Sequence, residues 1–220
     1  MSFREFAVCL AAFLLILSGL VFGIKFLRKR NYLLGLEWLV VAFSATNALL
    51  YFTMGWVASS YISLFCDAFS RGFGIPIVAV IGMMAVTHGY KPSIAKDFLF
   101  FGAAIAGTFV LVLSSAIAKP LPYFYVVMWS LYSVYLAFVI CKLANVGEYL
   151  HAVGLTFSLL AGQAIATIYD FYKIPGDDET KTVFYTFAML VWAYNIGQTY
   201  FAYCALERGG KKAGAVLQAR

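Results

Sequence analysis

The sequence predicts an all-α protein that crosses a membrane seven times, and two observations support this. Of its 220 residues, 63% are hydrophobic and only 12% are charged, whereas soluble domains carry about 25% charged residues. The apolar residues also form blocks of about 20 residues or more, long enough to cross a hydrocarbon core of about 30 Å as α-helices. Because these blocks fill most of the chain, we expect a single transmembrane domain over 1–208 and a short polar cytoplasmic tail over 209–220.

Seven helices are expected, joined by short connections. They cover residues 6–28, 33–56, 61–87, 97–117, 121–143, 149–171 and 181–206. Eleven basic residues lie at the ends that follow the first, third, fifth and seventh helices, and four lie at the other ends. Since Lys and Arg accumulate on the cytoplasmic side, the N-terminus is expected outside and the C-terminus in the cytoplasm. The expected location is a bacterial cytoplasmic (inner) membrane.

The stretch from Cys66 to Pro76 concentrates polar residues inside the third apolar block. Asp67 and Arg71 are four residues apart, so they share a helix face and can pair. Ionisable side chains at membrane depth are costly and mark functional sites. Pro76 removes a backbone donor and can kink the helix. We expect an ion pair facing the bundle interior, in which Arg71 attracts an anionic group or exchanges partners and Asp67 is its counter-ion or a protonatable coupling group.

Polar residues at a similar depth on several other helices predict one internal pocket. With about 100° between successive residues of an α-helix, they fall on common faces, and lipid does not tolerate unpaired polar groups. We expect the solute to contact Asn47, Asp67, Arg71, Gln163, Thr167, Trp192, Asn195 and Gln198. Trp129 could join Trp192 in covering a flat solute. Hydrogen bonding between helices, at roughly 0.6–2 kcal/mol each, is an alternative role for the Asn, Gln and Thr residues of this set.

Two further acids are interpreted by their depth. Glu37 lies about 7 Å from the inner end of its helix, at about 1.5 Å per residue. We therefore expect it to pair with Arg28 or Lys29 at the lipid headgroups. Asp170 falls at the outer rim, where we expect it to be solvated.

Enzyme signatures are absent from the sequence. It contains no HExxH, no GxSxG and no glycine-rich phosphate loop. The four cysteines form no CxxC pair and the two histidines are isolated, so we expect no enzyme, no metal site and no other cofactor. The basic residues lie between apolar blocks, where they set topology, so nucleic-acid binding is not expected either.

These observations favour a transporter of small solutes, with its pocket near the bilayer midplane around Asp67 and Arg71. A faint internal repeat points the same way, because Lys25 to Leu33 resembles Lys142 to Leu150 at a constant offset. The first three helices would then match the last three in the same orientation, with the nearly apolar helix at 97–117 as a linker that does not line the pocket. Such 3+1+3 parallel repeats occur in transporters.

Two alternatives to transport remain open. Seven helices with the N-terminus outside is also the layout of rhodopsin-type receptors, and an Asp and an Arg in the third helix resemble the microbial rhodopsins at the level of topology. The seventh helix contains no lysine from Val183 to Leu206, and Asn195 stands at mid-helix where a Schiff-base lysine would be needed, so covalent retinal is not expected. The other alternative is a non-catalytic subunit of a larger membrane complex, and a homo-oligomer is also open.

Overall fold

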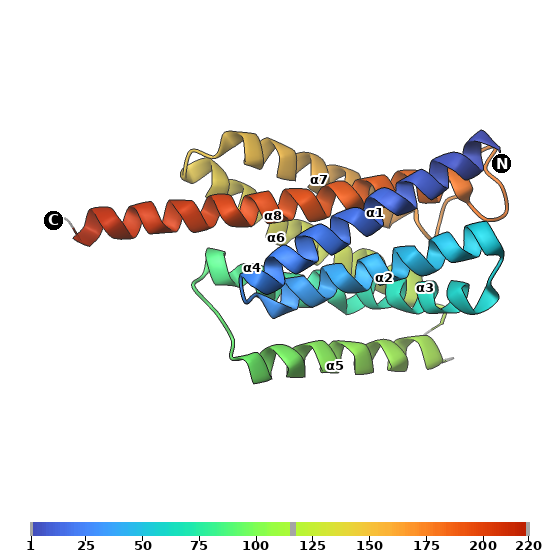
Figure 1. Cartoon of the computed structure of the whole chain (residues 1–220), viewed down its shortest axis with the longest axis horizontal. Coiled ribbons are helices and arrows are strands. Elements are labelled where there is room, and N and C mark those ends of the chain that lie inside the picture. The colour runs from blue at the N-terminus through green and yellow to red at the C-terminus, as the bar shows by residue number, and fades with distance from the viewer. Residues whose placement is uncertain (1, 115–117, 219–220) are drawn as a thin grey trace.

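The computed structural model describes residues 2–114 and 118–218, and within these ranges every regular element is a helix (Figure 1). The elements are α1 (Phe3–Arg28), α2 (Tyr32–Met54), α3 (Val57–Phe69), η1 (Ser70–Ala79), α4 (Val80–Thr87), α5 (Ile94–Leu113), α6 (Leu121–Asn145), α7 (Tyr149–Ile168) and α8 (Thr182–Gln218). Since α3, η1 and α4 follow one another without a break, the described part of the chain forms seven helices. The all-α prediction is confirmed.

Six of these helices are long and apolar enough, in the described residues, to cross a membrane. They are α1, α2, the continuous α3–η1–α4 helix, α5, α6 and α7. Large apolar side chains are exposed on the outer surface, among them Val134 at 71%, Leu113 at 77% and Leu150 at 81%. Extensive apolar surface on a folded protein marks contact with lipid or with another protein. Together these features indicate a multi-pass membrane protein.

The helices pack mainly against their neighbours in sequence and close into a ring (Figure 1). α1 packs between α2 and α8, α7 packs between α6 and α8, and α6 also contacts η1. α5 lies on the outside, against α2, α3 and η1. The core inside the ring includes the buried side chains of Phe26, Trp38, Leu143, Leu155 and Ile196. The ring therefore has an interior, bounded by α1, α2, η1, α6 and α8, that can hold a site.

The bundle has two ends, which we name by a residue at each. At the Gly55 end, α2 turns into α3 at Gly55, whose φ of 68° is the left-handed conformation that favours glycine. The loop 169–181 lies at the same end, and Arg4, near the N-terminus, donates to a carbonyl of that loop at 2.9 Å. At the Lys29 end, Lys29 follows α1 and pairs with Glu207 of α8 at 2.5 Å.

The acidic loop before α8 caps that helix. The Asp177 carboxylate accepts hydrogen bonds from the backbone N–H groups of Val183 and Phe184, at 3.0 Å each. Asp178 accepts one from the N–H of Thr182, also at 3.0 Å. The first N–H groups of a helix have no partner within the helix, and negative charge is favourable beside them. The acidity of this loop therefore supports the start of α8.

Most helix ends lie within four residues of those that the sequence predicts, and the end of the last helix differs most. The last helix is expected to end near 206, but α8 continues to Gln218 and projects beyond the other helices at the Lys29 end (Figure 1). No proline follows Leu206 to interrupt it. α5 ends at Leu113 rather than near 117, and residues 115–117 lie outside the described ranges.

The middle of the third span is a π-helix, η1, in which hydrogen bonds run to the fifth residue instead of the fourth. It contains Pro76, which has no N–H and whose ring clashes with the preceding turn of a regular α-helix. The sequence predicts a kink at this proline, and the wider turns of η1 are the form that the distortion takes. Arg71 lies in the first turn of η1, so the distortion is directly beside the ion pair.

Candidate functional site

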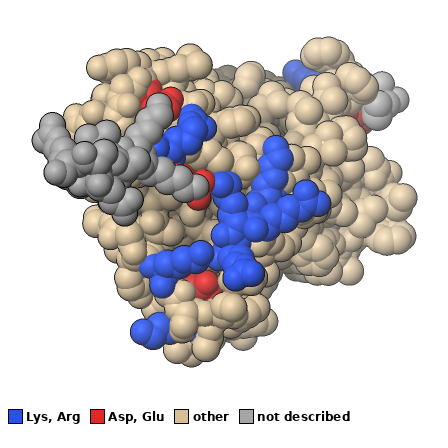
Figure 2. Space-filling model, turned by 60° about the vertical axis from the view of Figure 1, so that its left-hand side comes forward, with Lys and Arg blue, Asp and Glu red and all other residues tan. Residues whose placement is uncertain are grey.

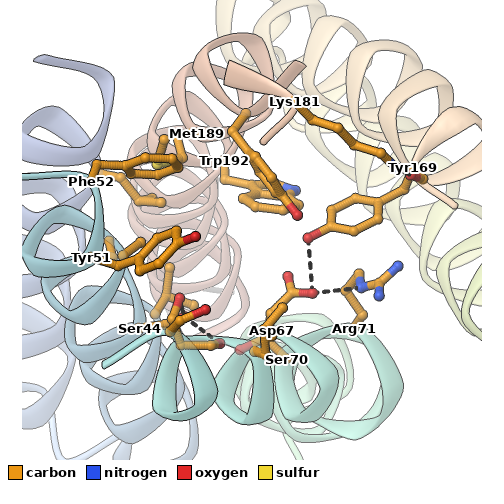
Figure 3. Close-up of a pocket in the computed structure, with 18 of the residues that line it drawn as sticks. Ser44, Tyr51, Phe52, Asp67, Ser70, Arg71, Tyr169, Lys181, Met189 and Trp192 are labelled. Atoms are coloured by element: carbon orange, nitrogen blue, oxygen red, sulfur yellow. Dashed lines mark hydrogen bonds and ion pairs between the residues drawn. The ribbon is translucent and has the colours of Figure 1, made fainter. Parts of the chain in front are cut away.

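A cavity of about 370 Å³ lies inside the bundle (Figure 3). This is the size of a small-molecule site. Its walls come from α1, α2, α3, η1, α6, Tyr169 and α8, and residues 179–181 stand at its mouth, at the Gly55 end. No residue of α5 lines it, in agreement with the prediction for the helix at 97–117. Much of the wall is apolar or aromatic, with Leu15, Val41, Tyr51, Phe52, Ile75, Tyr185, Met189 and Trp192.

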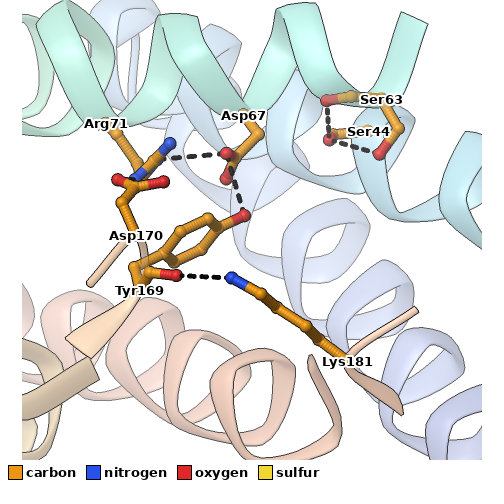
Figure 4. A network of polar contacts seen from close by, with 7 residues as sticks. All are labelled: Ser44, Ser63, Asp67, Arg71, Tyr169, Asp170 and Lys181. Atoms are coloured by element: carbon orange, nitrogen blue, oxygen red, sulfur yellow. Dashed lines mark hydrogen bonds and ion pairs between the residues drawn. The ribbon is translucent and has the colours of Figure 1, made fainter. Parts of the chain in front are cut away.

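One corner of the cavity holds a cluster of charged side chains (Figure 4). Arg71 Nε lies 3.0 Å from Asp67 Oδ2, and Arg71 Nη1 donates to Asp170 Oδ2 at 2.7 Å. Tyr169 donates its hydroxyl to the same Asp67 oxygen at 3.0 Å. The predicted Asp67–Arg71 ion pair is confirmed. Asp170 remains accessible to solvent, as expected, with 25% of its side chain exposed, but its carboxylate also pairs with Arg71, which the sequence does not predict.

Two aromatic rings lie against the Arg71 guanidinium. Its central carbon lies 4.0 Å from the ring centroid of Tyr125 and 3.8 Å from that of Tyr169. A guanidinium stacked on an aromatic face is stabilised by the ring quadrupole, by about 0.5–2 kcal/mol per contact. With two carboxylates and two rings around it, the Arg71 side chain is only 9% exposed. Residues of α6 and of the segment that follows α7 thus hold a charge that belongs to the third span.

Tyr169 connects this cluster to the mouth of the cavity. It follows the last residue of α7, and its ring stacks on Trp192 with centroids 6.0 Å apart and planes at 27°. Its backbone carbonyl accepts a hydrogen bond from Lys181 Nζ at 3.1 Å (Figure 4). Helix C-termini carry partial negative charge, so the Lys181 ammonium is held by the end of α7.

The polar side of the cavity continues along serines of α2 and α3. Ser44 donates to the Ser63 carbonyl oxygen at 3.1 Å, and their hydroxyls are 3.3 Å apart. Ser60 and Ser70 also line the cavity. The site therefore combines a charged corner, a row of hydroxyls and an aromatic wall.

The structure brings some of the predicted site residues to this cavity and not others. Asp67, Arg71, Trp192 and Asn195 line it, and so does Trp129. Asn195 is also a junction between three helices, because its side-chain oxygen accepts from Ser158 of α7 at 2.6 Å and from Tyr132 of α6 at 3.4 Å.

The other four predicted residues lie away from the cavity and bond elsewhere. Asn47 donates to the Phe43 carbonyl of its own helix, and Gln198 donates to the His151 carbonyl of α7. Gln163 bonds two serines of α6, and Thr167 is exposed and bonds Gln163. The polar stripe of α7 faces α6 rather than the cavity. A helical wheel groups residues on one face but does not say which neighbour that face meets.

The expectation that Glu37 pairs with Arg28 or Lys29 is wrong. Its side chain is fully buried and packs against Gly74 of η1, where even a methyl group would overlap the carboxyl. Both carboxyl oxygens lack a hydrogen-bond partner in the described part of the chain, and Lys29 pairs with Glu207. Counting residues along the helix predicts the depth of Glu37 in the membrane. It does not predict which neighbour the side chain faces, and that neighbour is the third span.

Several residues of the site are not identified by the sequence analysis: Tyr125, Tyr169, Lys181, Ser60 and Ser63 line the cavity or the cluster. No sequence signal separates Tyr125 and Tyr169 from the aromatic residues that gather at the membrane interfaces. In the described residues, no group of three His, Cys, Asp or Glu side chains could hold a metal ion.

Comparison with known proteins gives no relative from which to transfer a function. No family model, no curated protein and no solved structure matches the chain. The evidence for function is therefore the cavity and the residues that line it.

Proposed function

We propose that the protein transports a small solute and that the 370 Å³ cavity is its binding site. The observation that carries the proposal is a cavity with ion-paired side chains, enclosed by helices whose outer surface is apolar. Charged groups inside a membrane bundle are costly and are kept where they serve a pathway or a ligand. On this account the protein has no catalytic role.

The π-helix beside the cavity supports a moving part. π-helical turns occur at functional sites, and interfaces with two packings are the usual basis of alternating access. In η1, Arg71 and Pro76 share one distorted segment. A change in the conformation of η1 would move Arg71 relative to Asp170, which follows α7 and not η1.

The distribution of charge supports an orientation with the Gly55 end outside. Figure 2 shows Lys and Arg side chains gathered on the face of the Lys29 end. We propose that this face is cytoplasmic, in a bacterial inner membrane, and that the cavity opens outward. Reporter fusions after Arg30, Lys91, Val146 and Arg220 are expected to report cytoplasm, and fusions near Ser59, Lys119 and Asp177 the outside. Two successive fusions on one side would contradict the seven-span topology.

The packing order supports a 3+1+3 repeat. The contacts of α1 with α2, of α2 with α3 and of α1 with α8 correspond to those of α6 with α7, of α7 with α8 and of α6 with η1. Under this correspondence α5 has no counterpart and lies on the outside, as a linker would.

A ligand-responsive receptor is the second candidate, and the closed ring with α1 against α8 favours it. A receptor would bind the solute in the same cavity and would not carry it across. A subunit of a larger complex, or a homo-oligomer, would instead co-purify with its partner.

The proposal is tested with purified protein in two steps. A metabolite panel is screened for compounds that raise the melting temperature in detergent, since a ligand of the native state stabilises it. Compounds found in this way are then tested for uptake by proteoliposomes containing the protein, with empty liposomes as the control. Saturable, protein-dependent uptake is expected. Binding without uptake would overturn transport in favour of the receptor.

A further inference from the structure

Asp67 presents an unused acceptor to the cavity. Its Oδ2 atom lies 3.0 Å from Arg71 Nε and accepts a hydrogen bond from the Tyr169 hydroxyl, while Oδ1 has no hydrogen-bond partner among the residues that the structure describes. In Figure 3, that second oxygen points into the open space between Tyr169 and Ser44. An ionised carboxylate only accepts hydrogen bonds, so the complementary group on a ligand is a donor.

Arg71, in contrast, has little to offer an anionic solute. Its guanidinium is paired with Asp67 and Asp170 and lies against the rings of Tyr125 and Tyr169. With only 9% of the side chain exposed, little of the guanidinium is open to an anion. The expectation that Arg71 attracts an anionic group therefore has less support than recognition through Asp67.

The charges of the cluster point the same way. Two carboxylates, Asp67 and Asp170, surround one guanidinium, which leaves one negative charge unbalanced in a mostly apolar surrounding. The Lys181 ammonium is the other cation of the cavity lining, but it lies at the mouth, and no ion pair joins it to Asp67 or Asp170 among the described residues. A protonated amine at Asp67 Oδ1 would balance the cluster.

The wall opposite the cluster fits a flat apolar group. Tyr51, Phe52, Met189 and Trp192 face the cavity in Figure 3, and Tyr185 also lines it. Aromatic faces attract cations as well as apolar rings. From these observations we infer that the cavity selects a protonated amine that carries a flat apolar group, with the amine bound to Asp67. This inference rests on the proposed function, because it names the class of solute that the cavity binds.

Three compounds of nearly the same shape test the inference: 2-phenylethylamine, 2-phenylethanol and 3-phenylpropanoate. They differ in carrying a cation, a neutral hydroxyl or an anion. Equilibrium dialysis with wild-type protein in detergent is expected to give a Kd for the amine at least about tenfold below the other two, the equivalent of about 1.4 kcal/mol. Tighter binding of the anion or the alcohol contradicts the inference, and so does the absence of amine binding at millimolar concentration.

Two variants locate the amine. Asp67→Asn keeps the shape of the side chain and leaves Arg71 paired with Asp170, and it is expected to remove the preference for the amine. Glu148→Gln removes one carboxylate at the Lys29 end, where Glu148 pairs with Arg208, and it is expected to keep the preference. An unchanged preference in folded Asp67→Asn would overturn the assignment. If Asp67→Asn does not fold, the order of the three Kd values in wild-type protein still decides.

The outcome is separable from that of the transport proposal. Amine-selective binding without uptake into proteoliposomes would retain the solute class and reject transport. Protein-dependent uptake of anions but not of amines would retain transport and reject the solute class.

Discussion

Two acidic side chains, Asp67 and Glu37, lie on adjacent spans of the bundle and have different surroundings. Asp67 is surrounded by Arg71 and the Tyr169 hydroxyl and faces a cavity. Glu37 is fully buried against Gly74, and no ion pair to it is present among the described residues. The difference is that one acid is held by charged and polar partners, of which Tyr169 comes from a distant segment, and the other by packing. The energetic consequences of changing each should differ accordingly.

The largest effect is expected from removing the shared cation. Arg71→Ala leaves Asp67 and Asp170 as two neighbouring carboxylates without a counter-charge, which should cost about 3–5 kcal/mol of unfolding free energy. Asp67→Ala leaves Arg71 paired with Asp170 and should cost less. Denaturation in detergent micelles measures both. Equal losses would show that Asp170 does not contribute to holding Arg71.

A smaller loss of unfolding free energy is expected from enlarging Gly74, which packs against Glu37. A methyl group at Gly74 would overlap the Glu37 carboxyl, so Gly74→Ala should cost about 1–3 kcal/mol by overpacking. In a Glu37→Ala background the same substitution has room and should cost much less. A double-mutant cycle without coupling between these two positions would mean that they do not touch.

A still smaller effect is expected at the cap of α8, far from both acids. Asp177→Ala removes the acceptor for the N–H groups of Val183 and Phe184 and should cost about 1 kcal/mol. The matched variant Asp177→Asn keeps only one of the two acceptor oxygens and should lose an intermediate amount of stability. Thermal denaturation in detergent compares the two. An Asp177→Asn variant as unstable as Asp177→Ala would assign the loss to charge rather than to capping.

The stability that Asp178 adds at the start of α8 depends on pH. Hydrogen bonds from Thr182 lower the pKa of Asp178 to about 2. Because the folded pKa lies below the unfolded value of about 3.9, the stabilisation is complete above that value and is lost as the pH falls toward 2. Melting curves of wild type and Asp178→Asn should therefore differ by a constant amount from pH 5 to pH 8 and converge in stronger acid. A difference that changes between pH 5 and pH 8 would contradict this.

The parts of the fold that depend on local pattern could be predicted from the sequence. Helix positions follow from apolar block length, and the Asp67–Arg71 pair follows from a spacing of four residues. The apolar helix outside the cavity was predictable for the same reason, since it carries almost no polar residue to place inside. Each of these uses only neighbours along the chain.

The parts that depend on packing between distant helices could not be predicted. Tyr169 and Asp170 lie about a hundred residues from Asp67 and Arg71 in sequence, and nothing in either segment names the other. Glu37 and Gln163 show a second limit, because each is at the expected height but faces a different neighbour. The rotation of a helix about its axis is set by all the contacts it makes.

The most direct test of the central claim is solute uptake by a folded variant that lacks the charged pair. Replacing Asp67 and Arg71 together, by Asn and Gln, removes opposite charges at once and should be milder for stability than Arg71→Ala. Proteoliposomes with equal amounts of folded wild type and double variant are compared for uptake of the solute identified by thermal stabilisation. We predict that the double variant folds and loses uptake. Full uptake by the folded double variant would contradict the assignment of this cavity as the transport site.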